Sequence, residues 1–109
     1  MSETPYLELA QALDQLEARM IAEQLWSSQV PSAEALQSTK PFCVDTLSFE
    51  QWLQFIMLPT FRVMIAQALP LPTQCDIHSM ATEMWKDRHL EVQLCIQTID
   101  KIISGQVAS

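Results

Sequence analysis

Apolar residues recur at helical spacing in the first part of the chain. The residues that share one helical face there are Tyr6, Leu9, Leu13, Leu16 and Met20. Steps of three and four residues place side chains on one stripe of an α-helix, so the pattern predicts a helix over residues 5–27. The polar residues between them fall mainly off this stripe, as expected for a surface helix with one buried face.

A second segment is apolar on nearly every side. Between Trp52 and Ala66, apart from one proline, the polar side chains are Gln54, Thr60 and Arg62. A helix that is hydrophobic all round usually lies at the centre of its fold. We therefore expect this helix to be buried against several neighbours.

Two signals describe how the central helix begins and bends. Ser48 is followed three residues later by Gln51, which predicts a capping box at the helix N-terminus. Pro59 lacks an N–H and its ring clashes with the preceding turn. We therefore expect a kink at this proline rather than a straight helix.

The connection between these two helices is long. Residues 28–47 contain Pro31 and Pro41 and show no helical periodicity. A crossover of about twenty residues is unusual in a compact domain and is either functional or packed against the bundle. Packing is the preferred interpretation, because apolar residues alternate over residues 42–47 as in an extended segment with side chains in the core.

The last third of the chain carries a long apolar stripe. Its members are Trp85, His89, Val92, Ile96, Ile99 and Ile103. Pro70 and Pro72 end the central helix, and Asp76 is a candidate cap for the helix that follows. The periodicity leaves open whether residues 76–104 form one helix or two, the second alternative requiring a break around Lys86–His89.

Together these patterns predict an all-α fold, a compact bundle of about four helices with a long Pro-containing crossover between the first and second main helices. At 109 residues, one domain over residues 1–109 is expected. The chain has a single Gly. Such scarcity argues against a sandwich or barrel with many tight turns, and against a Gly-rich phosphate loop.

The charge of the chain limits its partners. Thirteen acidic residues against six basic ones give a net charge of −7, and residues 1–39 carry six of the acids and one of the bases. Nucleic-acid binding depends on cationic side chains, so direct binding of RNA or DNA is disfavoured. The charge is typical of a solvated acidic face, and its functional alternative is a helix that docks on a basic protein partner. No membrane segment is predicted, because Gln54, Pro59 and Arg62 interrupt the apolar run.

The reactive residues form no recognised constellation. The three cysteines, Cys43, Cys75 and Cys95, form no CxxC pair. Their odd number, and a chain start without the basic residues of a secretory signal, predict a reducing cytoplasm. Cys75 and His78 are three residues apart, but two ligands do not make a zinc site. We therefore predict no metal, no cofactor and no catalytic residue, and favour a protein that is not an enzyme.

The middle of the chain contains a specific pattern, Ser38-Thr39-x-Pro41-Phe42-x-x-Asp45-Thr46 followed by Trp52-Leu53-Gln54-Phe55-x-x-x-Pro59. With Leu69-Pro70-Leu71-Pro72 it resembles the YqcC-like family of small bacterial proteins. The resemblance implies a helical bundle of unknown function. Because members are often encoded beside a tRNA pseudouridine synthase, it also implies an accessory role in RNA modification. The binding residues that it suggests are Ser38, Thr39, Asp45, Thr46 and Gln54.

Two functional hypotheses follow from the sequence. The leading one is a non-catalytic helical protein-interaction module, with a homo-oligomer as one form of association, because the central helix carries a surplus of apolar surface. The alternative is a small-molecule-binding protein or enzyme whose pocket lies between the 37–47 crossover and the kinked central helix and uses Asp45, Thr46 and Gln54. For Asp45 and Thr46 the structural alternative is a local hydrogen bond within the crossover.

Overall fold

The computed structural model describes residues 3–72 and 75–105. Every regular element in this part of the chain is helical, which confirms the all-α prediction. In chain order the elements are α1 (Glu3–Ala22), α2 (Ala33–Leu36), the short 3₁₀ turn η1 (Pro41–Cys43), α3 (Phe49–Trp52), the π-helical turn η2 (Leu53–Met57), α4 (Leu58–Ala66), α5 (His78–Trp85) and α6 (Leu90–Gly105). None of the helices in these two ranges combines the length and the apolar character needed to cross a bilayer.

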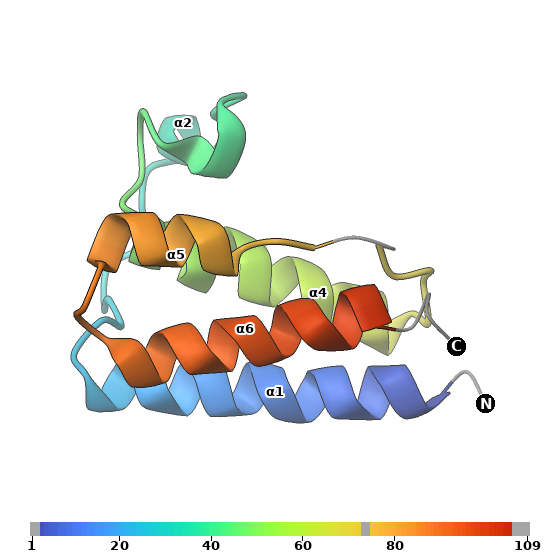
Figure 1. Cartoon of the computed structure of the whole chain (residues 1–109). Coiled ribbons are helices and arrows are strands. Elements are labelled where there is room, and N and C mark those ends of the chain that lie inside the picture. Colours follow the sequence, from blue (N-terminus) through green and yellow to red (C-terminus); the bar gives the residue numbers. More distant parts are fainter. Residues whose placement is uncertain (1–2, 73–74, 106–109) are drawn as a thin grey trace.

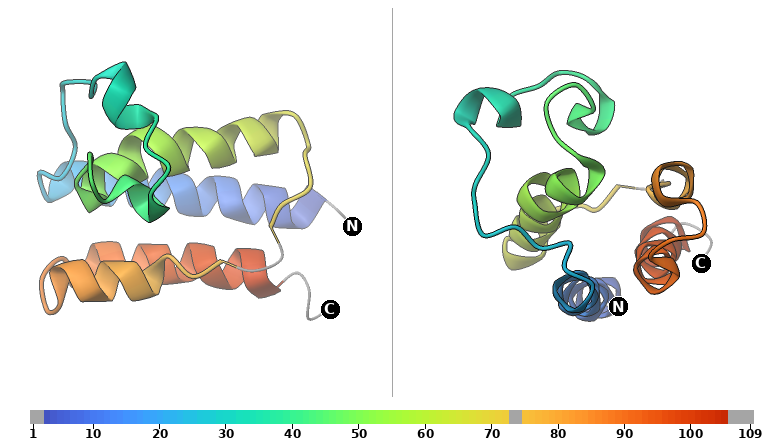
Figure 2. Two further views of the ribbon diagram at one scale, coloured as in Figure 1. Left: turned by 90° about the horizontal axis from the view of Figure 1, so that it is seen from above. Right: turned by 90° about the vertical axis from the view of Figure 1, so that its left-hand side faces the viewer.

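The elements form a four-rod bundle in which α3, η2 and α4 make one continuous rod. α1 and α6 lie side by side and run in opposite directions (Figure 1). The rods are in contact in the order α4, α1, α6, α5, so α5 packs on α6 while the central rod packs on α1. The crossover with α2 and η1 stands outside the four rods (Figure 2). The predicted long crossover is therefore present.

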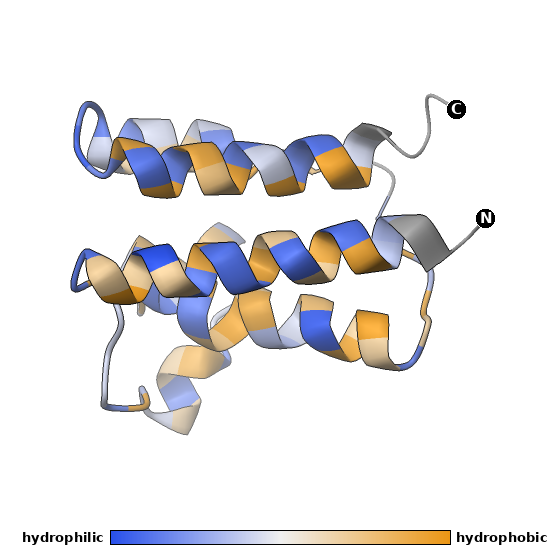
Figure 3. Cartoon of the chain, turned by 90° about the horizontal axis from the view of Figure 1, so that it is seen from below, coloured by the Kyte–Doolittle hydropathy of each residue, from blue (hydrophilic) through white to orange (hydrophobic). Residues whose placement is uncertain are grey.

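The core is built from the stripes that the sequence predicted. The fully buried large side chains are Leu9, Leu13, Leu16, Met20, Leu53, Leu58, Val92, Ile96, Ile99 and Ile103. Apolar and polar residues alternate along the ribbons of α1 and α6 (Figure 3). α1 and α6 thus each turn one apolar face inward and leave polar residues in water, which is the arrangement that the hydrophobic effect favours. The central helix was expected to be buried against several neighbours, but it packs mainly on α1 and leaves Val63 50% exposed.

The central rod begins where the sequence indicates, and its helix is widened into a π-turn just before Pro59. The Ser48 Oγ accepts a hydrogen bond from the Gln51 N–H, and the Gln51 side chain accepts one from the Ser48 N–H, so the capping box is confirmed. The distortion expected at Pro59 takes the form of the π-turn η2, in which the Leu58 N–H donates to the Leu53 carbonyl. A wider turn just ahead of the proline reduces the clash that its ring makes with the preceding turn.

The first helix ends earlier than predicted. α1 stops at Ala22 rather than near residue 27, because Gln24 takes a left-handed backbone conformation with φ 63°. The Leu25 N–H donates to the Met20 carbonyl at 2.8 Å, and the Gln24 N–H donates to the Ile21 carbonyl at 3.1 Å. This pair of bonds is a Schellman motif. The apolar residues that follow still pack on the core, which explains why the stripe continued beyond the helix.

The last third forms two helices rather than one. α5 ends at Trp85 and α6 begins at Leu90, so the break lies at Lys86–His89. Asp76 caps the start of α5 as predicted, because its carboxylate accepts hydrogen bonds from the Ser79 N–H and O–H.

Candidate functional site

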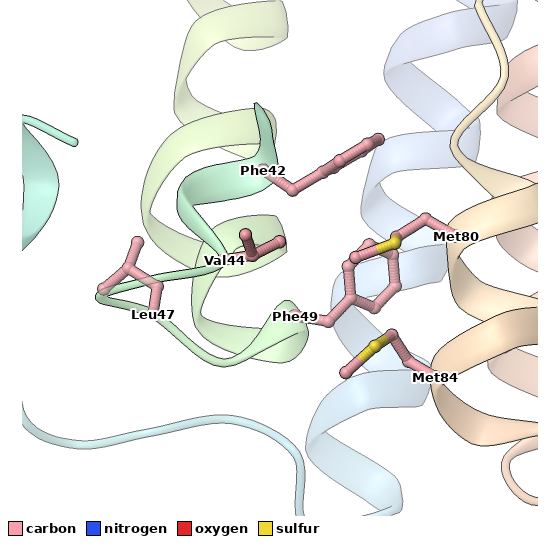
Figure 4. Close-up of a pocket in the computed structure, with 6 residues that line it drawn as sticks. All are labelled: Phe42, Val44, Leu47, Phe49, Met80 and Met84. Carbon is pink, nitrogen blue, oxygen red and sulfur yellow. The ribbon is translucent and has the colours of Figure 1, made fainter. Parts of the chain in front are cut away.

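An apolar groove opens between the crossover, α3 and α5 (Figure 4). Its volume is about 220 Å³. The side chains that line it are Phe42, Val44, Leu47, Phe49, Met80 and Met84. The crossover supplies the first three, α3 supplies Phe49, and α5 supplies the two methionines. All six are apolar, so the groove offers packing contacts and no chemical group that could react.

The crossover reaches the groove through a left-handed turn. Phe42 and Cys43 have φ angles of 57° and 52°, a conformation that is unfavourable for residues with a Cβ. Backbone hydrogen bonds hold the turn, since the Cys43 carbonyl accepts from the N–H of Leu47 at 2.8 Å and from that of Thr46 at 3.0 Å. The turn directs the Phe42 ring toward the central rod.

Two of the aromatic rings that line the groove, Phe42 and Phe49, pack on two tryptophan rings. The Phe42 ring meets the Trp52 ring edge-on with centroids 4.7 Å apart, and the Phe49 ring meets the Trp85 ring in the same way at 5.1 Å. Phe49 and Trp52 are stacked at 6.1 Å. Edge-to-face aromatic contacts stabilise beyond the area they bury. The cluster therefore fixes the crossover and α5 on either side of α3.

The rim of the groove is open to solvent. Val44 is 54% exposed and Met84 is 45% exposed, although both are apolar. Unbranched methionine side chains adapt to differently shaped partners. Pockets for small molecules usually have volumes of about 300–1,000 Å³ and a few converging polar groups. The groove is smaller than this range, and all six of its lining side chains are apolar.

Four of the sequence-predicted binding residues lie in the crossover and mostly bond to one another or to nearby backbone. The Ser38 O–H donates to Asp45 Oδ1 at 2.5 Å, and the Ser38 Oγ accepts from the Lys40 N–H. The Thr46 O–H donates to the Ala35 carbonyl at 2.7 Å, which ties the crossover to α2. Thr39 is exposed. None of these residues lines the groove.

The fifth predicted residue, Gln54, lies on the central rod and contacts the segment after α1. The Ser27 N–H donates to Gln54 Oε1, and the Gln54 Nε2 donates to the Ser27 carbonyl, both at 2.8 Å. The buried amide thus pairs with both polar groups of one backbone residue. The structure brings Ser38 and Asp45 together, but it does not bring the five residues into one pocket. The groove lies beside α5, and Asp45, Thr46 and Gln54 do not converge on it.

Acidic residues in and just after α1 contact basic side chains within the fold. Arg62 of α4 contacts Glu17 at 2.7 Å and Asp14 at 3.2 Å. The Glu23 carboxylate lies 2.8 Å from His89 Nδ1. These pairs attach α4 and the α5–α6 turn to α1, so a part of the negative charge has a structural role.

A buried polar cluster around Asp100 was not predicted. Asp100 is 8% exposed although it lies on α6 between buried isoleucines. Its Oδ1 accepts hydrogen bonds from the Cys75 S–H at 3.1 Å and the Ile77 N–H at 3.0 Å, and its Oδ2 accepts from the His78 N–H at 2.7 Å. The Ser104 Oγ accepts from the Cys75 N–H. Asp100 therefore joins α6 to the start of α5. In the sequence, the only indication of this role was its position beside Ile99 in the predicted apolar stripe.

The environment of Cys75 makes its thiol a poor nucleophile. Burial, and then the hydrogen bond to the Asp100 carboxylate and its charge, raise the pKa of the Cys75 thiol from 9.0 to about 12. The reactive form of cysteine is the thiolate, which is therefore scarce at neutral pH. No group of three metal-ligating side chains suited to a metal ion occurs within residues 3–72 and 75–105.

The raised pKa of Cys75 predicts a loss of stability at high pH. Below pH 9.0 the thiol is protonated in both the folded and the unfolded chain, so its contribution is complete. Between pH 9.0 and about 12 the unfolded chain releases this proton while the folded chain keeps it, so the free energy of unfolding falls. We expect urea unfolding over this pH range to show a shallower fall for Cys75→Ser than for the natural chain. Equal slopes would contradict the assignment.

The comparisons with known proteins identify relatives of this chain in other bacteria. A family model described as tRNA pseudouridine synthase C matches residues 8–103. An uncharacterised protein of Haemophilus influenzae is 35% identical over 77 residues, which cover 71% of this chain and 73% of that protein. The uncharacterised protein YqcC of Escherichia coli is 33% identical over 60 residues, or 55% of each chain.

One relative is much longer than this chain. A protein of Pectobacterium carotovorum named tRNA pseudouridine synthase C is 31% identical over 81 residues, which cover 74% of this chain but 22% of that protein. The chain therefore spans about a fifth of that relative and about half of YqcC. No solved structure matches the chain.

Proposed function

Because the chain belongs to the YqcC-like family of small bacterial proteins, we propose that it is a non-catalytic interaction module that docks on a tRNA pseudouridine synthase. The observation that carries this proposal is the relative from Pectobacterium carotovorum. It bears the name of that synthase, and a segment similar to this chain occupies 22% of its length. Two segments joined in one polypeptide are held at high effective concentration. The same association between two separate proteins would need a non-covalent contact.

The charge of the chain supports contact with protein rather than with tRNA. A net charge of −7 opposes approach to a phosphate backbone, whose binding relies on lysine and arginine. The same charge favours association with a basic surface, such as that of a protein that binds tRNA. The module would then act through the synthase and not through its own contact with the substrate.

The apolar groove is the docking surface that we propose. Its exposed residues Val44 and Met84 are each next to an exposed acid in the sequence, Asp45 and Glu83. A partner segment with an apolar side chain beside lysine or arginine would complement this arrangement. Interface energy usually concentrates in a few buried anchors surrounded by polar contacts.

The test is a binding measurement with the tRNA pseudouridine synthase C of the same organism. Both purified proteins are mixed and their affinity is measured by calorimetry. We expect a complex, and we expect Met84→Lys to weaken it by at least about tenfold, because a charge in an apolar contact loses solvation without a partner. The matched control is Leu94→Lys on α6, since Leu94 is 55% exposed and does not line the groove.

Two outcomes would count against the proposal. Absence of any complex between the folded proteins would remove the synthase as the partner. An equal affinity for Met84→Lys and Leu94→Lys would remove the groove as the docking surface. Circular dichroism of both variants shows whether the helical fold is kept.

A further inference from the structure

The turn between α5 and α6 has an unfavourable backbone. Lys86 has φ 55° and ψ −111°, and His89 has φ 54°. The Arg88 N–H donates to the Trp85 carbonyl at 2.9 Å, which closes a four-residue turn with Lys86 at its second position. These angles correspond to a type II′ turn, where this position is normally occupied by glycine. Side chains with a Cβ are strained at both places.

Contacts from outside the turn hold it in this conformation. The buried Gln93 side chain donates from Nε2 to the Lys86 carbonyl at 2.9 Å and to the Arg88 carbonyl at 2.8 Å. The His89 ring reaches Glu23 at the end of α1. The turn is thus held by Gln93 of the adjoining helix and by Glu23 from a distant segment, rather than by the preferences of its own residues.

The sequence across the turn is suited to a continuous helix. The buried apolar residues on either side are Ile77, Ala81, Trp85, Val92, Ile96, Ile99 and Ile103. With His89 between the two groups, every step is three or four residues, so the stripe keeps its helical phase through the break. Residues 75–104 contain neither proline nor glycine. The same segment can therefore form either a helical hairpin or one long helix.

We propose that Lys86–His89 is the hinge of a domain swap between two copies of this chain. In the open form the hinge becomes helical and α6 leaves its own bundle. It takes the same place against α1 and α5 of the second copy, which contributes its own α6 in return. A swap of this kind keeps the apolar core contacts of α6, gives up the two hydrogen bonds from Gln93 to the turn, and relieves the two left-handed residues. Short strained hinge loops are known to favour it.

The swap is independent of the proposed docking function. The groove is lined by the crossover, α3 and α5, which stay together in one chain when α6 is exchanged. A swapped dimer would therefore present two intact grooves. Failure of one proposal leaves the other untouched.

The experiment measures the dimer-to-monomer ratio of the full chain after refolding at high protein concentration, by size-exclusion chromatography with light scattering. We expect a dimer that persists after dilution, because exchange requires α6 to leave the core. Lys86→Gly should lower the ratio by about tenfold or more, since glycine favours the turn and disfavours the helix. Asp87→Ala should raise it, because alanine is the best helix former.

The matched control is Lys101→Gly, an exposed position within α6 that is helical in both forms. It should lower stability without changing the ratio. The hinge is overturned if neither the natural chain nor Asp87→Ala forms a dimer. A dimer that dissociates at once on dilution, and that forms to the same extent in Lys86→Gly, also overturns the hinge proposal. Such a dimer would be held together by surface contacts rather than by exchange of α6.

Discussion

Replacement of Asp100 by alanine is expected to lower the free energy of unfolding by about 2–4 kcal/mol, the range for loss of a buried, hydrogen-bonded charge. The Asp100 carboxylate accepts from the backbone N–H groups of Ile77 and His78, and these groups at the start of α5 have no partner within the helix. Removal of the carboxylate leaves both N–H groups and the Cys75 thiol without their acceptor. The measurement is urea-induced unfolding followed by circular dichroism at neutral pH.

Two further variants make the Asp100 prediction specific. Asp100→Asn keeps the shape and one carbonyl oxygen but loses the charge, so we expect a smaller loss of about 1–2 kcal/mol. Asp45→Ala removes an exposed carboxylate with one side-chain partner and should cost less than about 1 kcal/mol. If Asp100→Ala were as stable as Asp45→Ala, Asp100 would not be the link between α5 and α6.

The sequence predicted the rods and their buried faces because apolar residues recur every three or four positions along them. Leu9, Leu13 and Leu16 on α1, and Ile96 and Ile99 on α6, are all fully buried. Burial of such a stripe is the main favourable term in folding, and its spacing is visible without any structure. The capping box at Ser48 was visible for the same reason, since both of its partners lie within one helical turn.

The ends of the helices were less predictable because this chain uses almost no glycine. Within residues 3–72 and 75–105, left-handed backbone occurs at six residues other than glycine, which are Gln24, Phe42, Cys43, Ala68, Lys86 and His89. Such positions usually carry a glycine that reveals them in a sequence. Here their residue types give no signal, so the end of α1 was placed about five residues late and the α5–α6 break stayed open.

The predicted binding residues show the limit of reading polar side chains from sequence. Gln54 pairs with a backbone group 27 residues away, and Asp100 bonds to groups 22 and 23 residues away. Contacts over such separations depend on tertiary packing, which no local pattern reveals. A binding role for Ser38, Thr39, Asp45, Thr46 and Gln54 stays a prediction. The groove is lined by apolar residues instead. The prediction that the alternating apolar side chains of residues 42–47 lie in the core was wrong for Val44, which is exposed.

Trp85→Ala is expected to give the largest loss of stability, about 3–5 kcal/mol, as found for buried tryptophan and phenylalanine replaced by alanine. Trp85 is 4% exposed, and its ring contacts Phe49 of α3 and His89 of the following turn. α5 packs mainly on α6, and the contact of this ring with Phe49 links α5 to the central rod. The free energy of unfolding in urea measures the loss.

Met84 is the matched control for Trp85, since it is the preceding residue of the same helix and differs in exposure. Met84→Ala should lower the free energy of unfolding by less than about 1 kcal/mol, because half of its side chain is already in water. If the groove is the docking surface, Met84→Ala should nevertheless weaken synthase binding while the fold stays intact. Equal losses of stability in the two variants would mean that Met84 belongs to the core and that the groove is closed in solution. A large loss for Trp85→Ala alone would separate the residue that holds α5 in place from the one that α5 presents to a partner.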